Sequence, residues 1–221
     1  MTDLLQNHPF FRDKKIESYT LIKDQGYCNE NYLVVADGVK HIVRKLLRDD
    51  IDRAFEWQVQ HLAFEKGITA EPLVFDSGNG LMIFAFLEGE HKHQLDKSEL
   101  KLLARTLQRL HSIKIDAKPI ILDIDTGTVD RYKKEYVLCH NDLNPQNIFF
   151  AKDAKLIDFE YAGINDRYFD LASVCMEFGL DEKRQKVFLE AYFESEYNAD
   201  KLEAYKVIYK TICDEWFAKN L

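Results

Sequence analysis

The fold is decided by two neighbouring stretches of sequence, HNDLNPQNIFF at His140–Phe150 and KLIDFE at Lys155–Glu160. Each contains a stretch typical of a short strand, 148–150 in the first and 156–158 in the second, and the residues between them are small or charged. We therefore expect a hairpin of two short strands. With its turn centred between residues 152 and 153, Asn147 is predicted to lie across the ladder from Asp158.

Three polar side chains gather at the open end of this predicted hairpin. Asp142 lies on the loop that leads into it, and Asn147 and Asp158 flank it. A facing amide oxygen and carboxylate suit a hard cation such as Mg²⁺, and a further carboxylate can accept a proton from a hydroxyl nucleophile. Each residue alone is more simply explained as the cap of a turn. The ordered set of three, however, is the arrangement that kinase-type phosphoryl transfer requires.

Composition excludes several classes of protein. The chain has 221 residues and a formal net charge of −8, which argues against a protein that holds nucleic acid or anionic lipid by neutralising phosphates. Its longest apolar run, Leu81–Leu87, is too short for a membrane helix of about 20 residues.

The N-terminus lacks a secretion signal and the four cysteines lie far apart. We expect a cytoplasmic protein with neither a disulfide framework nor a zinc site, and no nucleic-acid or membrane partner. Nothing in the sequence indicates an oligomeric state.

The N-terminal part of the chain is rich in predicted strands. The candidates are residues 19–23, 31–36, 40–45, 73–75 and 81–86. Asp37-Gly38 is a strong signal for a two-residue hairpin between the second and third. A helix is predicted over 52–66, with Gly67 at its C-terminal cap.

From Asp96 onward, helices predominate. Asp96 and Glu99 form a capping-box pattern ahead of a helix. The stretch 119–135 has no clear period and is expected to be a connection. Helical apolar stripes are formed by Leu100, Leu103, Leu107 and Leu110, by Leu171, Val174, Cys175 and Phe178, and by Leu202, Tyr205, Tyr209, Ile212 and Trp216. The sequence therefore predicts an α+β protein with a small β-rich lobe at 1–88 and a larger α-helical lobe at 89–221.

The motif around the hairpin resembles a known family. His140-x-Asp142 followed by Asn147, and then Ile157-Asp158-Phe159-Glu160, is similar to the phosphotransferases that include aminoglycoside phosphotransferases and choline/ethanolamine kinases. The continuation FEYAGINDRYFDLA at Phe159–Ala172 resembles choline kinases and their bacterial relatives more specifically. The resemblance implies a two-lobed protein-kinase-like fold, with the nucleotide bound by the N-terminal lobe and with ATP and Mg²⁺ as cofactors.

The resemblance also implies roles for residues of the C-terminal lobe. Asp142 would be the catalytic base, Asn147 and Asp158 would hold Mg²⁺, and Asp170 would brace the catalytic loop. Only eleven residues separate Asp158 from Asp170. This spacing leaves no room for the long activation loop of a protein kinase.

In the N-terminal lobe, Arg44 stands where kinases place the cation that meets the α- and β-phosphates, and Glu56 would orient it. Lys45 is a rival, but adjacent strand residues point to opposite faces, so only one of the two can fill this role. The phosphate-covering loop would be 26–31, with amide contacts from Asn29 or Asn31 despite a single glycine. The backbone of Phe86, Leu87 and Glu88 would meet the adenine edge.

The expected substrate is choline or ethanolamine. A trimethylammonium group has no hydrogen-bond donors, so aromatic faces and nearby carboxylates must select it. Glu160, Tyr161, Glu177 and Trp216 are the candidates, whereas Tyr205 and Tyr209 are more simply core residues, and His91 and His93 are expected to be solvated. The alternatives are a kinase for another small alcohol, such as thiamine or an aminoglycoside, and an inactive kinase-like binding module.

Overall fold

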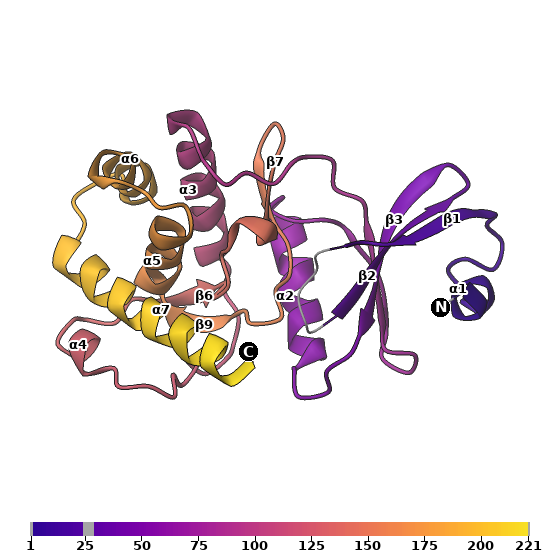
Figure 1. Cartoon of the computed structure of the whole chain (residues 1–221), viewed down its shortest axis with the longest axis horizontal. Coiled ribbons are helices and arrows are strands. Elements are labelled where there is room, and N and C mark those ends of the chain that lie inside the picture. Colours follow the sequence, from indigo (N-terminus) through magenta and orange to yellow (C-terminus); the bar gives the residue numbers. More distant parts are fainter. Residues whose placement is uncertain (1, 24–28, 221) are drawn as a thin grey trace. The chain divides into compact units, whose positions relative to one another are not determined.

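The computed structural model describes residues 2–23 and 29–220. The chain divides into two compact units, Met1–Phe64 with Ala70–Glu88, and Glu65–Thr69 with Gly89–Leu221. Figure 1 traces both along the chain. The predicted lobes 1–88 and 89–221 differ from these units in residues 65–69, which pack with the second unit.

The first unit is built on an antiparallel sheet of five strands in the order β1-β2-β3-β5-β4. The strands are β1 (Ile16–Leu21), β2 (Asn29–Ala36), β3 (Val39–Leu46), β4 (Pro72–Asp76) and β5 (Leu81–Ala85). The predicted strands are confirmed with shifted ends. Asp37 and Gly38 both have positive φ, 51° and 74°, which is the geometry of the predicted two-residue turn.

Helices cover the core of this sheet. The predicted helix is confirmed as α2 (Arg53–Glu65), and Gly67 follows it with φ of 66°. Helix α1 (Thr2–Asn7) was not predicted, because six residues are too few for a clear period. Leu5 and Phe11 nevertheless become fully buried in a cluster with Val34, Val43 and Ile83, so the N-terminal segment belongs to the core of the first unit.

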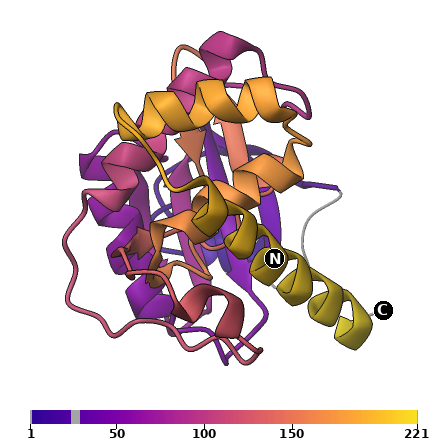
Figure 2. The ribbon, with the colours of Figure 1, turned by 90° about the vertical axis from the view of Figure 1, so that its left-hand side faces the viewer.

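The second unit is mainly helical, and Figure 2 looks onto its helices. They are α3 (Lys97–His111), α4 (Gly127–Asp130), α5 (Arg167–Glu177), α6 (Glu182–Phe193) and α7 (Ala199–Asn220). The capping box predicted from Asp96 and Glu99 is present at the start of α3. No described helix is both long and apolar enough to cross a membrane.

Two small antiparallel sheets of two strands each complete the second unit. Strand β6 (Tyr136–Cys139) pairs with β9 (Gly163–Asp166), and β7 (Ile148–Phe150) pairs with β8 (Ala154–Leu156). A short 3₁₀ helix, η1 (Pro145–Asn147), leads into β7. The β6–β9 pair was not predicted, because β9 consists of Gly-Ile-Asn-Asp, which has little strand propensity of its own.

The predicted register of the β7–β8 hairpin is wrong by one residue. Ile148 pairs with Leu156 and Phe150 with Ala154, so the turn has three residues rather than four. Ala154 and Leu156 are both fully buried, and this alternation fixes the register because a one-residue slip would turn both side chains outward. Asn147 consequently lies opposite Ile157, whose N–H donates to its carbonyl over 3.0 Å, and Asp158 follows beyond the ladder.

The 65–69 segment belongs to the second unit through contacts with this hairpin. The N–H of Leu156 donates to the carbonyl of Ile68 over 2.8 Å, and the ammonium of Lys155 donates to the carbonyl of Gly67. Sequence reasoning assigned these residues to the β-rich lobe because their neighbours along the chain on both sides belong to it.

Candidate active site

The loop that follows β6 is held at its start by one buried carboxylate. Asp170 on α5 is fully buried. It accepts the main-chain N–H of His140 over 2.8 Å and that of Asn141 over 2.9 Å. Asn141 has φ of 65°, a conformation that asparagine tolerates better than most residues. The bracing contact expected of Asp170 is confirmed.

His140 connects the loop to the end of the β7–β8 hairpin. Its imidazole is fully buried, with Nε2 lying 2.9 Å from the carbonyl oxygen of Ile157 and Nδ1 lying 3.3 Å from the main-chain nitrogen of Asp142. These partners require a proton on Nε2 and a lone pair on Nδ1. The ring thus fixes the position of Asp142 relative to the residue that precedes Asp158.

Two side-chain amides hold the carboxylate of Asp142. Asn144 donates to Oδ1 over 3.1 Å and Asn147 donates to Oδ2 over 2.8 Å, while the same Asn147 amide nitrogen lies 2.9 Å from the Asp142 carbonyl oxygen. Asn144 also caps η1 by accepting the N–H of Gln146. The result is a half-exposed carboxylate in a fixed orientation, as a general base requires.

Asn147 and Asp158 are the two predicted cation ligands. Because Nδ2 of Asn147 is directed at Asp142, its Oδ1 is directed away from that carboxylate. Asp158 follows Ile157 with φ of 66°, so the chain turns sharply just after the contact with Asn147. The two residues therefore lie close together, although they are not cross-strand partners.

Tyr161 and Glu160 lie on the segment that returns from the hairpin to β9. The carbonyl of Tyr161 accepts the side-chain amide of Asn141 over 3.0 Å, and Asn165 donates to Oδ1 of Asn141 over 2.9 Å. Glu160 is half-buried and Tyr161 is exposed. Sequence reasoning missed the structural part played by Asn141 and Asn165. A polar residue in a non-glycine left-handed position leaves no distinctive sequence signal.

The candidate substrate residues on the helices are placed by α5 and α7. Glu177, at the end of α5, accepts the hydroxyl of Tyr209 over 2.8 Å. Cys213, one turn beyond Tyr209 on α7, has a raised pKa, first because of burial and also because of the negative charges of Glu177 and Asp142. Trp216 lies on this helix and is half-buried.

Tyr209 was expected to be a core residue only. Its ring is buried and packs edge-on against Phe169, as expected, but its hydroxyl also binds the candidate substrate carboxylate. The spacing of apolar residues along a helix predicts that a tyrosine ring is buried, but it does not predict which group the hydroxyl contacts.

In the first unit, the predicted phosphate-binding cation lies in a buried charged cluster. Arg44 on β3 places Nη1 2.9 Å from Oε1 of Glu56 on α2, and its Nε donates to Asn31. Arg53, which sequence reasoning missed, binds Oε2 of Glu56 over 2.7 Å and Oδ1 of Asn29 over 3.0 Å. The side chains of Arg44 and Glu56 are only 7% and 4% exposed, so their pairing is largely shielded from water.

Lys45, the alternative candidate for the phosphate-binding cation, lies outside this cluster. Lys45 pairs with Glu30 over 3.4 Å and its side chain is 44% exposed. The two adjacent residues of β3 thus meet different partners, as the alternation of a strand requires. Part of the predicted phosphate-covering loop lies outside the described residues, at 24–28.

The predicted hinge residues follow β5 at the end of the first unit. Phe86 and Leu87 are half-buried, with Leu87 packed against Ala70, Met82 and Phe84. Glu88 is exposed and pairs with Lys40 over 3.1 Å. The Lys40 ammonium also lies 4.7 Å from the ring centroid of Phe86.

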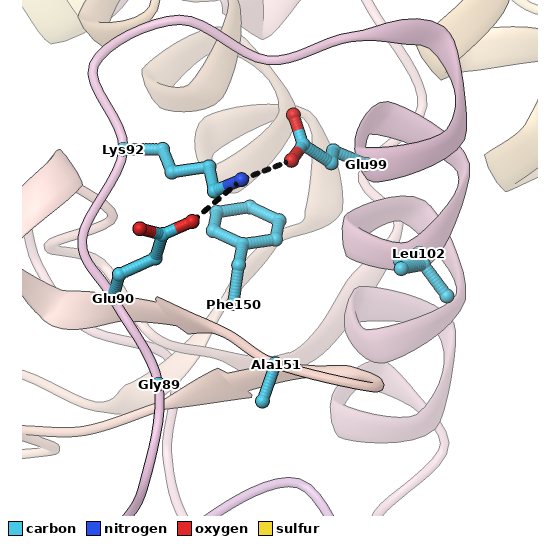
Figure 3. A pocket seen from close by; sticks show the side chains of 7 residues that line it. All are labelled: Gly89, Glu90, Lys92, Glu99, Leu102, Phe150 and Ala151. Atoms are coloured by element: carbon cyan, nitrogen blue, oxygen red, sulfur yellow. Dashed lines mark hydrogen bonds and ion pairs between the residues drawn. The ribbon is translucent and has the colours of Figure 1, made fainter.

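A hollow of about 390 Å³ in the second unit contains none of the predicted site residues. Figure 3 shows Lys92 between the carboxylates of Glu90 and Glu99, at 2.8 and 2.6 Å. A cation already paired twice leaves little charge for a ligand. Gly89 at the edge of this hollow has φ of 152°, and a Cβ there would lie 2.9 Å from the carbonyl oxygen of Phe150.

His91 is exposed, as expected, but its side chain also has partners in the protein. Its Nδ1 lies 3.2 Å from the carbonyl of Pro145 and 3.0 Å from that of Ile148, and its ring contacts Phe149. It therefore ties the segment after Gly89 to the turn that carries Asn147.

The sequence of this chain is similar to those of known phosphotransferases and their relatives. Residues 121–205 match the model of the phosphotransferase enzyme family. Protein LicA of Haemophilus influenzae is 26% identical over 231 residues, covering 87% of this chain and 86% of that protein.

Solved structures show the same fold. The choline kinase LicA of Streptococcus pneumoniae superposes with a TM-score of 0.79 at 19% identity, covering 98% of this chain and 89% of that one. Spectinomycin phosphotransferase APH(9)-Ia superposes with a TM-score of 0.74 at 12% identity, covering 96% and 84%. The predicted α+β, protein-kinase-like fold is confirmed.

Proposed function

We propose that this chain is a phosphotransferase that transfers the terminal phosphoryl group of ATP to the hydroxyl of a small amino alcohol, choline or ethanolamine. Its residues 121–205 match the model of the phosphotransferase enzyme family. The observation that carries this proposal is the amide-held carboxylate of Asp142, with Asn147 and Asp158 beside it. Kinase-type transfer needs a base aimed at the hydroxyl and ligands for the cation on the phosphates.

Asp142 is the proposed general base. The amides of Asn144 and Asn147 each donate to one of its oxygens, and each oxygen retains a lone pair for the substrate hydroxyl. As the hydroxyl oxygen forms a bond to the γ-phosphorus, its proton passes to Asp142 and the bond to the leaving ADP oxygen breaks. Fixing the carboxylate beforehand lowers the entropic cost of reaching this geometry.

Arg44 is the proposed partner of the nucleotide phosphates. Glu56 binds two guanidinium groups, those of Arg44 and Arg53, which fixes the orientation of Arg44. An arginine in this position remains fully charged and can bind phosphate oxygens in a fork. The linker Phe86–Glu88 is proposed to meet the adenine edge through its backbone, and Asn29 to support the phosphate-binding arginines.

Mg²⁺ fits the donor set at Asn147 and Asp158. Their potential ligand atoms are oxygens, an amide Oδ1 and a carboxylate, and Mg²⁺ binds through one or two such groups together with phosphates and water. When bound there, it would neutralise charge on the nucleotide phosphates. Holding these two oxygens near each other is what η1 and the turn at Asp158 contribute.

The amino-alcohol assignment is supported by the acidic surroundings of α7. Glu177 carries a negative charge next to Tyr209, and its charge and that of Asp142 both act on Cys213. Trp216 on the same helix offers an aromatic face, and Glu160 and Tyr161 lie on the segment that also binds Asn141. LicA of Streptococcus pneumoniae, a choline kinase, shares this fold.

The test is a transfer assay with ATP and Mg²⁺ over choline, ethanolamine, thiamine and spectinomycin, with product identified by mass spectrometry. We expect phosphocholine or phosphoethanolamine, and no turnover when Mg²⁺ is chelated. Product from thiamine or spectinomycin alone would replace the substrate assignment and leave the phosphotransferase assignment in place.

A separate binding experiment distinguishes an inactive module. Thermal stabilisation by ATP should increase when Mg²⁺ is added, because the nucleotide and metal bind together. Absence of both turnover and Mg²⁺-dependent stabilisation would contradict the proposal.

A further inference from the structure

A chain of hydrogen bonds runs from helix α6 to the start of the catalytic loop. The Tyr192 hydroxyl lies 2.6 Å from Nδ1 of His111, and Nε2 of His111 lies 3.0 Å from Oδ2 of Asp170. Asp170 in turn accepts the N–H groups of His140 and Asn141. We propose that Tyr192 and His111 are positioning residues for this loop, and we call the chain from Tyr192 to the two N–H groups the Tyr192 relay. The inference rests on the proposed role of Asp142.

The partners define the direction of every bond in the Tyr192 relay. Asp170 receives N–H donors from three groups, so it acts as an acceptor throughout. His111 must then donate from Nε2, which leaves a lone pair on Nδ1 to accept the Tyr192 O–H. Burial raises the pKa of this phenol, so it keeps the proton that it donates. All polar groups are satisfied with His111 neutral and protonated on Nε2.

The burial of these residues raises the cost of losing any one of these hydrogen bonds. His111 and Tyr192 are 5% and 4% exposed, and Asp170 is fully buried. Water therefore cannot replace a lost partner, and a buried polar group without one destabilises the conformation that created it. Removal of the Tyr192 hydroxyl leaves Nδ1 of His111 without its donor, so the ring loses one of the two hydrogen bonds that fix its orientation toward Asp170.

The same residues do not form a metal site. His111, Asp170 and Cys139 place potential ligand atoms within 4.8 Å of one another. Burial raises the pKa of the Cys139 thiol well above its usual value, and the thiol donates to the main-chain carbonyls of Asn165 and Asp166. Since Asp170 is already bonded to three N–H groups, the cluster is saturated by protein hydrogen bonds.

Tyr192→Phe tests the Tyr192 relay, and Tyr168→Phe is its matched control. Tyr168 is also buried, at 2% exposure, and its hydroxyl accepts the N–H of Asn198, outside the relay. We expect Tyr192→Phe to lower kcat by about 3- to 10-fold, with KM for ATP and for the amino alcohol within about twofold of wild type. Tyr168→Phe should lower the melting temperature without lowering kcat. Equal kcat losses in the two variants, or none in Tyr192→Phe, would overturn the proposal.

Two further measurements do not depend on turnover. ¹⁵N NMR of the His111 ring should show a proton on Nε2 in wild type, and the Nδ1 resonance should shift in Tyr192→Phe because that nitrogen loses its hydrogen-bond donor. Hydrogen exchange of the His140 and Asn141 amides should accelerate in Tyr192→Phe and not in Tyr168→Phe. An Nδ1-protonated ring in wild type, or unchanged exchange, contradicts the Tyr192 relay even if the enzyme proves to act on another alcohol.

A conservative variant tests the donor to Asp170. In His111→Gln, the side-chain amide keeps an N–H donor for Asp170, whereas His111→Leu has no donor or acceptor. We expect its kcat to lie between those of wild type and His111→Leu, with the ordering reproduced in the exchange rates of the two amides. Equal effects of Gln and Leu would show that the N–H donor to Asp170 contributes nothing.

Discussion

The side-chain amide of Asn147 donates to Oδ2 of Asp142 over 2.8 Å. This bond makes one residue serve two groups, because the amide nitrogen orients the proposed base while the amide oxygen is left for the proposed cation. The same residue type is required for both, since neither a carboxylate nor a hydrocarbon could donate to Asp142 and offer an oxygen elsewhere.

Asp142→Asn should lower kcat by about 100-fold or more, because an amide cannot accept the hydroxyl proton. Asn144 and Asn147 would also face an additional N–H group where they now meet two acceptor oxygens. Nucleotide binding, measured by thermal stabilisation with ATP and Mg²⁺, should be nearly unchanged. The exposed Asp181, which caps α6, gives a matched control in Asp181→Asn. Turnover of Asp142→Asn within a few-fold of wild type would remove Asp142 from the role of base.

Asp158→Ala and Asn147→Ala should both raise the Mg²⁺ concentration that gives half-maximal rate. The effect should be larger for Asp158, because a charged oxygen ligand binds a hard cation more strongly than an amide oxygen. Asn147→Ala should in addition lower kcat at saturating Mg²⁺, since Asp142 loses one of its two amide donors. Gln146→Ala, an exposed neighbour in η1, is the control. An unchanged Mg²⁺ requirement in Asn147→Ala would show that its amide only orients Asp142.

The sequence predicted the elements of the site better than their geometry. The His140–Glu160 motif identified the hairpin and its three polar residues, because the chemistry limits which residue types can stand there. The register was wrong by one because a turn of three residues and a turn of four are both compatible with small and charged residues, and only the burial of Ala154 decides between them.

Long-range partners could not be predicted at all. Tyr192 and His111 are hydrogen-bonded to each other although they lie 81 residues apart along the chain. Likewise, Arg53 joins the Glu56 cluster only because the first turn of α2 faces β2. Such contacts depend on how helices pack, which leaves little trace in the local pattern of a single sequence.

His41 should make the first unit less stable in mild acid. Burial lowers its pKa below the usual 6.5, and the charge of Lys14 lowers it further. Since the folded-state pKa lies below the unfolded one, neutral His41 contributes its full stability above about pH 6.5, and this contribution is lost as the pH falls below that value. Its ring packs edge-on against Phe10 and Phe11, so phenylalanine is a suitable replacement.

Urea unfolding at pH 7.5 and 5.5 measures this effect. The free energy of unfolding should fall between the two pH values by less in His41→Phe than in wild type. His61→Gln, at an exposed position on α2, should retain the wild-type dependence. An identical fall in wild type and His41→Phe would exclude His41 as its source.

Selection of choline by its charge is the prediction that tests the substrate site most directly. The neutral isostere 3,3-dimethylbutanol has the same shape and hydroxyl, so any preference for choline must come from ring faces and carboxylates. A desolvated cation–π contact contributes about 2 kcal/mol, and the field of Glu177 adds to it. We therefore expect kcat/KM for choline to exceed that for the isostere by at least about 30-fold. Trp216→Ala should remove most of this difference.

Ethanolamine should depend on the carboxylate instead, since its ammonium can donate hydrogen bonds to Glu177. Glu177→Gln should lower kcat/KM for ethanolamine more than for choline, and Tyr209→Phe should have a smaller effect in the same direction because Glu177 loses the hydroxyl donor that orients its carboxylate. Asp214→Asn, a matched change at an exposed position on α7, should leave the preference unchanged. Equal rates for choline and its isostere would refute the choline assignment, and equal effects of Glu177→Gln on both amino alcohols would show that this carboxylate acts only through its charge.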